Sequence, residues 1–204
     1  MNPNELLDLI KHRRVVRRFE PGRAIDEGAI RRVLEAAIWA PFSAYAPQQW
    51  KFIAARGAER DAVVDIIKND HTVLKYLRLM YEESRYGGDE DAKWSAAAQE
   101  FAKTLGGAPV VVVSLVHQDP HGRRMQHNTI AAWCGGENMM LQAQAEGLAT
   151  GVVSLTSAKV QVQLVEHFGL DPDEWAPAFA MNLGYAAETP EPTPRQMEAV
   201  EIRG

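Results

Sequence analysis

A cluster of arginines near the amino terminus is the part of the sequence best suited to binding an anion. Arg13, Arg14 and Arg17 follow an amphipathic segment, residues 4–12, that is expected to be a helix. Guanidinium groups bind phosphate through paired hydrogen bonds and keep their charge at physiological pH. The same spacing is also found on solvated basic faces, so the residue types alone leave both interpretations open.

The distribution of charge sets this cluster apart from the rest of the chain. The 204 residues carry a formal net charge of -5, yet the first 32 contain eight Lys and Arg against five Asp and Glu. Nucleic acid is not expected as a partner, because proteins that bind it present a net basic face. The cluster is therefore a candidate site for a small anionic ligand.

The remaining residues with reactive side chains are less specific. His117, His121 and His127 match no helical spacing of metal ligands, so a solvated loop is favoured and no metal site is predicted. The single cysteine, Cys134, excludes a disulfide framework, and its apolar neighbours favour a position in the core.

Several common sequence signatures are absent. The chain contains no G-x-G-x-x-G, no G-x-x-x-x-G-K-[ST] and no G-x-S-x-G, so a Rossmann crevice, a P-loop and a hydrolase elbow are unsupported. The longest apolar run, residues 108–113, is too short to cross a bilayer, and the first ten residues lack the pattern of a signal peptide. We expect a cytoplasmic protein with no membrane partner.

Helical and extended patterns alternate around these residues. Helices are predicted over 4–12, from the Asp26 cap to Pro41, over 58–69, over 125–146 and after the Ser157 cap; strands are predicted over 50–55, 109–116, 149–155 and 177–185. This order predicts one α/β (α+β) domain, residues 1–204, built as a three-layer sandwich with a central mixed sheet flanked by helices.

Two segments fall outside this pattern. The polar residues 70–107 are predicted to form a lid or excursion over a site. The proline-rich residues 186–204 are predicted to form an extended carboxy-terminal arm, in which Val200–Ile202 could pair as an edge strand of this or another chain.

Short motifs follow one another along the chain in a defined order. They are Arg13-Arg14-Val15-Val16-Arg17-Arg18-Phe19, Ala40-Pro41-Phe42-Ser43, Gln48-Gln49-Trp50, Glu137-Asn138-Met139-Met140-Leu141, Gly147-Leu148-Ala149-Thr150-Gly151, Leu183-Gly184-Tyr185 and Pro194-Arg195. In this order and spacing the chain resembles the FMN-dependent nitroreductase family over about residues 5 to 200. Val15 replaces the serine of the family pattern, which removes one hydroxyl contact.

The resemblance implies a homodimer with one non-covalent FMN per chain at the subunit interface. Arg13, Arg14 and Arg17 would face the phosphate and the ribityl chain, and Arg195 would close on the same phosphate. Such an arrangement is physically reasonable, because several guanidinium groups can neutralise a phosphate that carries nearly two negative charges.

The resemblance also implies which residues surround the isoalloxazine ring. Phe42 and Ser43 would lie against it from the partner chain, and Lys103 would lie near its N1 and O2 edge, although a solvated helix lysine is the alternative. The backbone at Val153, Ser154 and Leu155 would approach flavin N5, where a hydrogen-bond donor tunes hydride transfer. Ser154 is the expected catalytic residue, with a locally bonded serine at a strand end as the alternative.

The expected lid contains a possible substrate contact. Glu82 and Tyr86 have a spacing that resembles the lid of the halotyrosine dehalogenase branch, where such residues grip an amino acid. A charged helix end is the alternative interpretation of this pair.

The expected function is therefore that of an FMN-dependent oxidoreductase. NAD(P)H would deliver hydride to flavin N5, and a nitroaromatic, quinone or similar acceptor would then take the electrons. The alternatives are a reductive dehalogenase of a halotyrosine-like substrate, a flavin-binding protein without turnover, and a phosphate-ligand binding module without flavin. The sequence does not name the acceptor, nor does it choose between NADH and NADPH.

Overall fold

Four strands form one sheet at the centre of the computed structural model, which describes residues 3–42, 48–68, 100–101, 103–118, 123–192 and 194–203. The strands are β1 (Trp50–Arg56), β2 (Val110–His117), β3 (Ala149–Val153) and β4 (Trp175–Gly184), and they lie in the order β1-β2-β4-β3. All three ladders are antiparallel, and the only parallel pairing among the described residues is an isolated bridge between Val15 and Thr150. The expected mixed sheet is thus antiparallel in its ladders.

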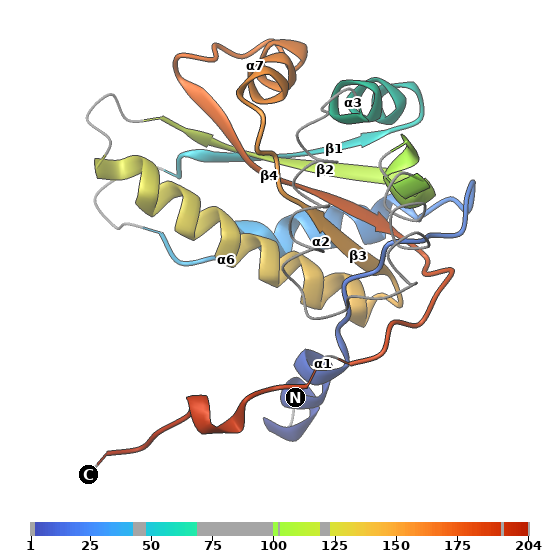
Figure 1. Cartoon of the computed structure of the whole chain (residues 1–204), viewed down its shortest axis with the longest axis vertical. Helices are drawn as coiled ribbons and strands as arrows, with labels where there is room; N and C mark the ends of the chain where they lie inside the picture. The colour runs from blue at the N-terminus through green and yellow to red at the C-terminus, as the bar shows by residue number, and fades with distance from the viewer. Residues whose placement is uncertain are drawn as a thin grey trace, which may run out of the picture.

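Helices cover both faces of this sheet, which confirms the expected three-layer architecture (Figure 1). The helices α3 (Ala58–Lys68) and α7 (Ala158–His167) pack on one face. The helices α2 (Glu27–Ile38) and α6 (Arg123–Ala145) pack on the other. No described helix has the length and apolar character needed to cross a membrane.

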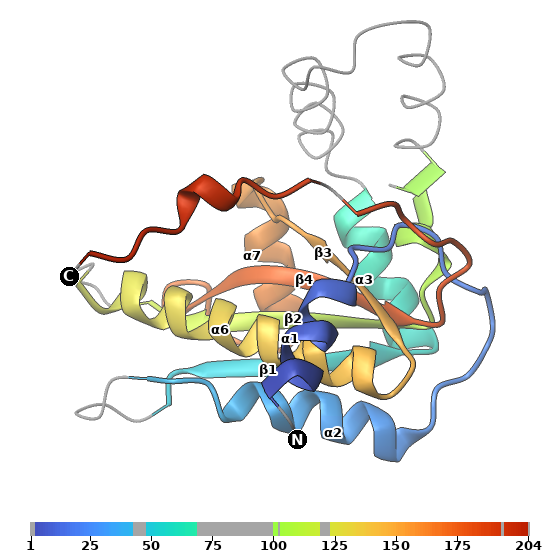
Figure 2. The same ribbon diagram turned by 90° about the horizontal axis from the view of Figure 1, so that it is seen from below.

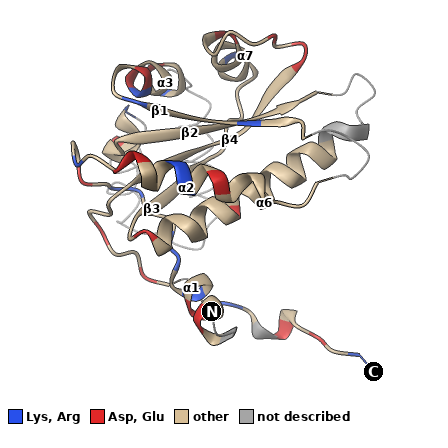
Figure 3. Cartoon of the chain, turned by 180° about the vertical axis from the view of Figure 1, so that it is seen from behind, with Lys and Arg blue, Asp and Glu red and all other residues tan. Residues whose placement is uncertain are grey.

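Strand β2 explains why both faces are covered. Val111, Val113 and Leu115 point into the core with α3 and α7, whereas Val110 and Val112 point into the core with α2 and α6. Successive side chains alternate between the two faces of a strand, so an apolar run requires apolar cover on both sides. Neither β2 nor β4 contains Lys, Arg, Asp or Glu, and Figure 3 shows the positions of such residues mainly on the described helices and loops.

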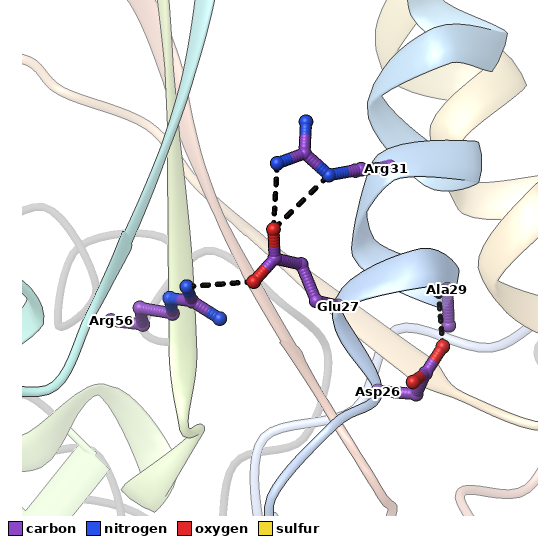
Figure 4. A network of polar contacts seen from close by, with 5 residues as sticks. All are labelled: Asp26, Glu27, Ala29, Arg31 and Arg56. Carbon is purple, nitrogen blue, oxygen red and sulfur yellow. Dashed lines mark hydrogen bonds and ion pairs between the residues drawn. The ribbon is translucent and has the colours of Figure 1, made fainter.

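The helix ends follow the capping residues predicted from sequence. The Asp26 carboxylate accepts a hydrogen bond from the Ala29 N–H at 3.0 Å at the start of α2. The next residue, Glu27, accepts hydrogen bonds from Arg31 and from Arg56 at the end of β1, so the same helix end is tied to the sheet (Figure 4). On the opposite face of the sheet, Ser157 caps α7.

Three further elements complete the described part of the chain. Helix α1 (Pro3–His12) precedes the arginine cluster, a single turn η1 (Leu105–Gly107) leads into β2, and a second turn η2 (Met197–Ala199) interrupts the carboxy-terminal arm. The arm runs away from the sheet and ends at a distance from it (Figures 1 and 2). Val200–Ile202 forms no strand in this chain, and most of the expected lid, residues 70–107, lies outside the described residues.

Candidate functional site

The arginine segment, residues 13–20, lies against β3, which is an edge strand of the sheet. The Val16 N–H donates to the Thr150 carbonyl at 2.9 Å, and the Phe19 N–H donates to the Gly106 carbonyl at 2.9 Å. An antiparallel bridge then joins Phe19 to Ala186, just after β4. Segments that are far apart in sequence therefore meet around these arginines (Figure 2).

Two glycines permit this close approach of backbone to backbone. A Cβ atom built on Gly151 would collide with the Val16 carbonyl oxygen, and one built on Gly106 would collide with the Arg17 carbonyl oxygen. Gly106 also has a φ of 75°, a conformation that residues with a side chain rarely adopt. Both positions therefore require glycine for the arginine segment to lie where it does.

Arg17 is fixed at both its backbone and its side chain. Its Nη1 donates to the Val152 carbonyl at 3.0 Å, and its guanidinium lies 5.2 Å from the centroid of the Phe101 ring. Its backbone N–H donates to Oε1 of Glu188 at 2.6 Å. Desolvation lowers the pKa of Arg17, and the charge of Glu188 opposes this shift. A guanidinium stays protonated at neutral pH even so, so Arg17 places a positive charge beside the end of β3.

Arg13 and Arg14 lie at the end of α1 with fewer constraints. Arg13 Nε is 3.3 Å from Oε1 of Glu137 on α6, but this nitrogen is buried and has no hydrogen-bond partner among the described residues. Arg14 donates from Nη1 to the carbonyls of Lys11 and Arg13, at 2.6 and 3.0 Å. A guanidinium has five N–H donors, so Arg14 and Arg17 both keep donors for a ligand.

The end of β3 supplies the second expected part of the site. The strand ends at Val153 rather than at Leu155, because the chain then turns toward α7 and the Leu155 carbonyl accepts from the Gln161 side chain at 2.6 Å. Val153 and Leu155 are buried, whereas Ser154 between them is exposed. The structure thus brings Arg17 and the 153–155 backbone together through the contact of Arg17 with Val152.

Other expected site residues lie elsewhere in the chain. Phe42 packs edge-on against Trp50 at the start of β1, with ring centroids 5.6 Å apart. Because β2 and β4 separate β1 from β3, the strand that Phe42 packs against lies about 14 Å from β3, on the far side of the sheet from Ser154. One chain therefore does not bring Phe42 to its own arginine cluster.

Lys103 and Arg195 are both exposed in this chain. Lys103 Nζ lies 3.2 Å from Oε2 of Glu100 on the same helical turn, a placement in keeping with a solvated lysine. Arg195 lies on the carboxy-terminal arm. Ser43, Glu82 and Tyr86 lie outside the described residues, so their expected roles stay predictions.

Two residues at the site had no role in the sequence analysis. Glu188 touches the backbone of the arginine segment, and the Phe101 ring lies beside the Arg17 guanidinium. Phe101 belongs to a helical pattern of apolar residues, so the sequence predicts that it lies in the core. That pattern gives no sign of its contact with the Arg17 guanidinium. For Glu188 the only signal is an acidic residue at the start of a proline-rich tail, which does not point to arginines 170 positions earlier.

The arrangement as a whole is suited to an anion beside a strand end. Arg17 reaches Val152, two residues before the exposed Ser154, and Arg13 and Arg14 precede it in the same segment. Among the described residues no group of three or more His, Cys, Asp or Glu side chains could hold a metal ion.

Comparisons with known proteins give a consistent result. The model of the nitroreductase family matches residues 10–185. The protein named "Putative NAD(P)H nitroreductase YdgI" of Bacillus subtilis (strain 168) is 23% identical over 194 residues, which are 91% of this chain and 90% of that protein.

Solved structures share the fold over the whole chain. The FMN-dependent nitroreductase NfnB from Mycobacterium smegmatis, crystallised with NADPH, superposes with a TM-score of 0.77 at 19% identity, and the match covers 100% of both chains. A nitroreductase with bound FMN from Desulfitobacterium hafniense DCB-2 gives a TM-score of 0.70 at 19% identity, again over 100% of both chains. At such low identity these two structures show similarity of fold.

Proposed function

The chain belongs to the nitroreductase family, and from this premise we propose that it is an FMN-dependent oxidoreductase that uses NAD(P)H to reduce a nitroaromatic, a quinone or a similar acceptor. The observation that carries the proposal is the position of Arg17. It reaches the end of β3 with its side chain while the rest of the arginine segment lies alongside.

The residues present fit the phosphate and ribityl chain of FMN. Arg14 and Arg17 keep N–H donors, and the buried Arg13 Nε lacks a hydrogen-bond partner among the described residues. Charge-assisted hydrogen bonds from guanidinium to phosphate are among the strongest in proteins. Arg195 on the arm would add a further positive charge at the same phosphate.

Bound FMN would supply the two-electron redox chemistry of the proposed reaction. The protein would orient the ring with the backbone at Val153, Ser154 and Leu155. Ser154, exposed at that point, can donate its hydroxyl proton in a hydrogen bond to the ring edge. Arg17 would hold a fixed positive charge close by, and Lys103 would add a second positive charge.

The absence of a dinucleotide fingerprint agrees with this scheme. A nicotinamide cofactor would dock only transiently, deliver its hydride and leave, and the acceptor would then occupy the same space. A site used in turn by two ligands does not need the glycine-rich loop that holds a dinucleotide tightly.

The proposed active form is a homodimer. Apolar side chains are exposed at the end of α2, on α6, on α1 and on the arm: Ile38, Trp39 and Phe42; Ile130 and Trp133; Leu6, Leu7 and Ile10; Val200 and Ile202. Trp39 is 77% exposed, which is unusual for the largest apolar side chain. A second copy that covers these residues would also allow Phe42 and Ser43 to reach the partner's flavin.

The visible spectrum of the purified protein tests the proposal. We expect a yellow protein with one FMN per chain, bleached by NADH or NADPH without oxygen and recoloured by a quinone or a nitroaromatic compound. Flavin that neither nicotinamide cofactor bleaches would instead identify a flavin-binding protein without turnover. A colourless protein that does not take up added FMN would favour a module for another phosphate ligand.

The dehalogenase alternative rests on Glu82 and Tyr86, which lie outside the described residues, so it stays a prediction from sequence. Micromolar binding of iodotyrosine to the oxidised protein, measured as quenched flavin fluorescence, would support it over a general nitroreductase.

A further inference from the structure

We propose that Glu188 is a positioning residue that fastens the start of the carboxy-terminal arm to the arginine segment and thereby holds Arg17 in place for its ligand. The fastening stands on contacts within this chain. The consequence for FMN rests on the proposed function, and the experiments below separate the two.

The Glu188 carboxylate accepts three hydrogen bonds from two consecutive arginines. Oε1 accepts from the Arg17 N–H at 2.6 Å and from the Arg18 N–H at 3.1 Å, and Oε2 accepts from Arg18 Nε at 3.0 Å. Successive backbone N–H groups that converge on one point form an anion-binding concavity. In this chain the anion is the side chain of Glu188 itself.

The carboxylate completes a short stretch of pairing between the two segments. The Glu20 N–H donates to the Tyr185 carbonyl at 2.9 Å, and the Ala187 N–H donates to the Arg18 carbonyl at 3.0 Å. Glu188 is the next residue, and Pro190 and Pro192 follow as the arm leaves the core. Glu188 therefore extends this pairing by one residue at the point where the proline-rich part of the arm begins.

This arrangement fixes Arg17 both at its backbone and at its guanidinium group. Its backbone N–H is bound by Glu188, while its guanidinium is bound by the Val152 carbonyl and lies beside Phe101. A solvated ion pair would contribute little, because water screens its charges and ordering two long side chains costs entropy. The Glu188 side chain is only 21% exposed, and two of its three donors are backbone groups, which a mobile surface pair does not have.

The electrostatics of Glu188 agree with this geometry. Desolvation disfavours the charged carboxylate, but the hydrogen bonds from the Arg17 N–H and from Arg18 outweigh it, so the pKa of Glu188 is lowered. A carboxylate that stays charged despite partial burial is stabilised by its donors.

The first experiment measures the fastening in flavin-free protein. Amide hydrogen exchange of residues 15–20, followed by mass spectrometry, is compared in the wild type, Glu188→Ala, Glu188→Gln and the control Glu191→Ala. We expect exchange of this segment to be at least ten-fold faster in Glu188→Ala and intermediate in Glu188→Gln, which keeps one acceptor oxygen. Glu191 is exposed on the same arm, so its variant should exchange like the wild type. Unchanged exchange in both Glu188 variants would overturn the fastening.

The second experiment measures the positioning of Arg17. FMN dissociation constants are determined for Glu188→Gln, Arg17→Ala and the double variant. We expect Glu188→Gln alone to weaken FMN binding about five- to twenty-fold, with the rate of flavin reduction at saturating FMN unchanged. The effect should vanish in the Arg17→Ala background, because both residues act through the same guanidinium. Equal effects of Glu188→Gln in both backgrounds would overturn the positioning role.

These readouts distinguish failure of the inference from failure of the proposed function. If the wild type binds no FMN, the proposed function fails, while hydrogen exchange still decides the fastening. If the wild type binds FMN and Glu188→Gln binds it equally well, the positioning role alone is wrong. Should Glu188→Ala fail to fold, as judged by circular dichroism, Glu188→Gln carries both tests.

Discussion

Arg17 is the residue on which the candidate site depends most, because three separate parts of the chain fix it. Glu188 binds its backbone, and Val152 and Phe101 contact its guanidinium. A side chain that is already ordered loses less conformational entropy when it binds a ligand, so its hydrogen bonds contribute more to affinity.

Replacing Arg17 with alanine should therefore weaken FMN binding without unfolding the protein. A hydrogen bond to a charged group contributes about 1.5–3 kcal/mol, which corresponds to a rise of about 10- to 150-fold in the dissociation constant. Fluorescence titration of flavin-free protein measures this change. Arg31→Ala is the matched control, because it removes the same charge from the exposed face of α2. Equal affinities of the two variants would place the phosphate elsewhere.

At the residue scale, sequence could identify the arginines but not what holds them. Guanidinium groups next to a helix end are visible as a local pattern, and the resemblance assigned them to a phosphate. Phe101 and Glu188 are non-local partners, so their roles follow only from the folded backbone. The separation of Phe42 from Ser154 likewise depends on strand order, which residue spacing does not determine.

At the scale of elements, helix α6 has to pack closely against both α2 and the sheet, and two consecutive glycines make this possible. A Cβ atom on Gly136 would lie 2.8 Å from the Phe179 ring, and one on Gly135 would lie 3.0 Å from the Ala37 carbonyl oxygen. Phe179 is completely buried in β4, so it has little freedom to move away. The two glycines therefore set how closely α6 approaches the sheet.

Gly136→Ala should destabilise the protein although alanine is the better helix former. The gain in helix propensity is about 1 kcal/mol, whereas overpacking a rigid core costs about 1–3 kcal/mol. We expect a net loss of up to about 2 kcal/mol in the free energy of unfolding, measured by urea denaturation. Adding Phe179→Leu should make the Gly136→Ala change less harmful, because the smaller side chain leaves room for the new methyl group. A Gly136→Ala variant more stable than the wild type would show that Phe179 on β4 can shift to make room for the new methyl group.

A second contact between elements joins α2 to the end of α6 and depends on pH. Glu146 accepts two hydrogen bonds from Arg32, at 2.7 and 2.8 Å, which together with a hydrogen bond from Gln142 lower the pKa of Glu146 to about 2 against opposing desolvation. A group whose pKa is lower in the folded state than in the unfolded state stabilises the fold above the unfolded value. For Glu146 this stabilisation is present above about pH 4.5 and is lost as the pH falls toward 2.

Comparison of the wild type with Glu146→Gln tests this linkage. The difference between their thermal unfolding midpoints should be constant from pH 7 to pH 5 and should shrink steadily below that. Arg203 pairs with Glu201 on the exposed arm, so Glu201→Gln should show little difference at any pH. A Glu146→Gln difference that persisted undiminished at pH 3 and below would contradict the assignment.

The elements themselves could largely be predicted from sequence, because caps and apolar periodicity are local signals. The Asp26 and Ser157 caps and the apolar run at 110–116 are examples that the structure confirms. Strand direction could not be predicted in the same way. An apolar run shows that a strand is buried on both faces, but antiparallel and parallel neighbours bury it equally well, so the expected mixed sheet had no local basis.

At the scale of the whole molecule, the exposed apolar side chains are the observation that supports the proposed homodimer. They gather on α1, α2, α6 and the arm, whereas the described part of α7 exposes a single large apolar residue, Val162. Scattered apolar residues are normal on a surface, but groups of them on neighbouring helices mark an interface. Helices α2 and α6 lie side by side on one face of the sheet, which makes that face the expected contact with a second copy (Figure 1).

Ile130→Glu should therefore convert the protein into monomers and lower its affinity for FMN. Ile130 is 53% exposed on α6, so a charge there is harmless in a monomer but would be buried without a partner in the dimer. We expect the dimer dissociation constant, measured by analytical ultracentrifugation, to rise at least ten-fold, which is about 1.4 kcal/mol. Val162→Glu on α7 introduces the same charge at a similarly exposed position, 42%, on the opposite face, and it should remain dimeric with FMN bound.

FMN should be lost together with dimerisation, because Phe42 lies too far from Ser154 to serve the flavin of its own chain. A wild type that sediments as a folded, flavin-bound monomer at micromolar concentration would contradict both the dimer and the proposed role of Phe42.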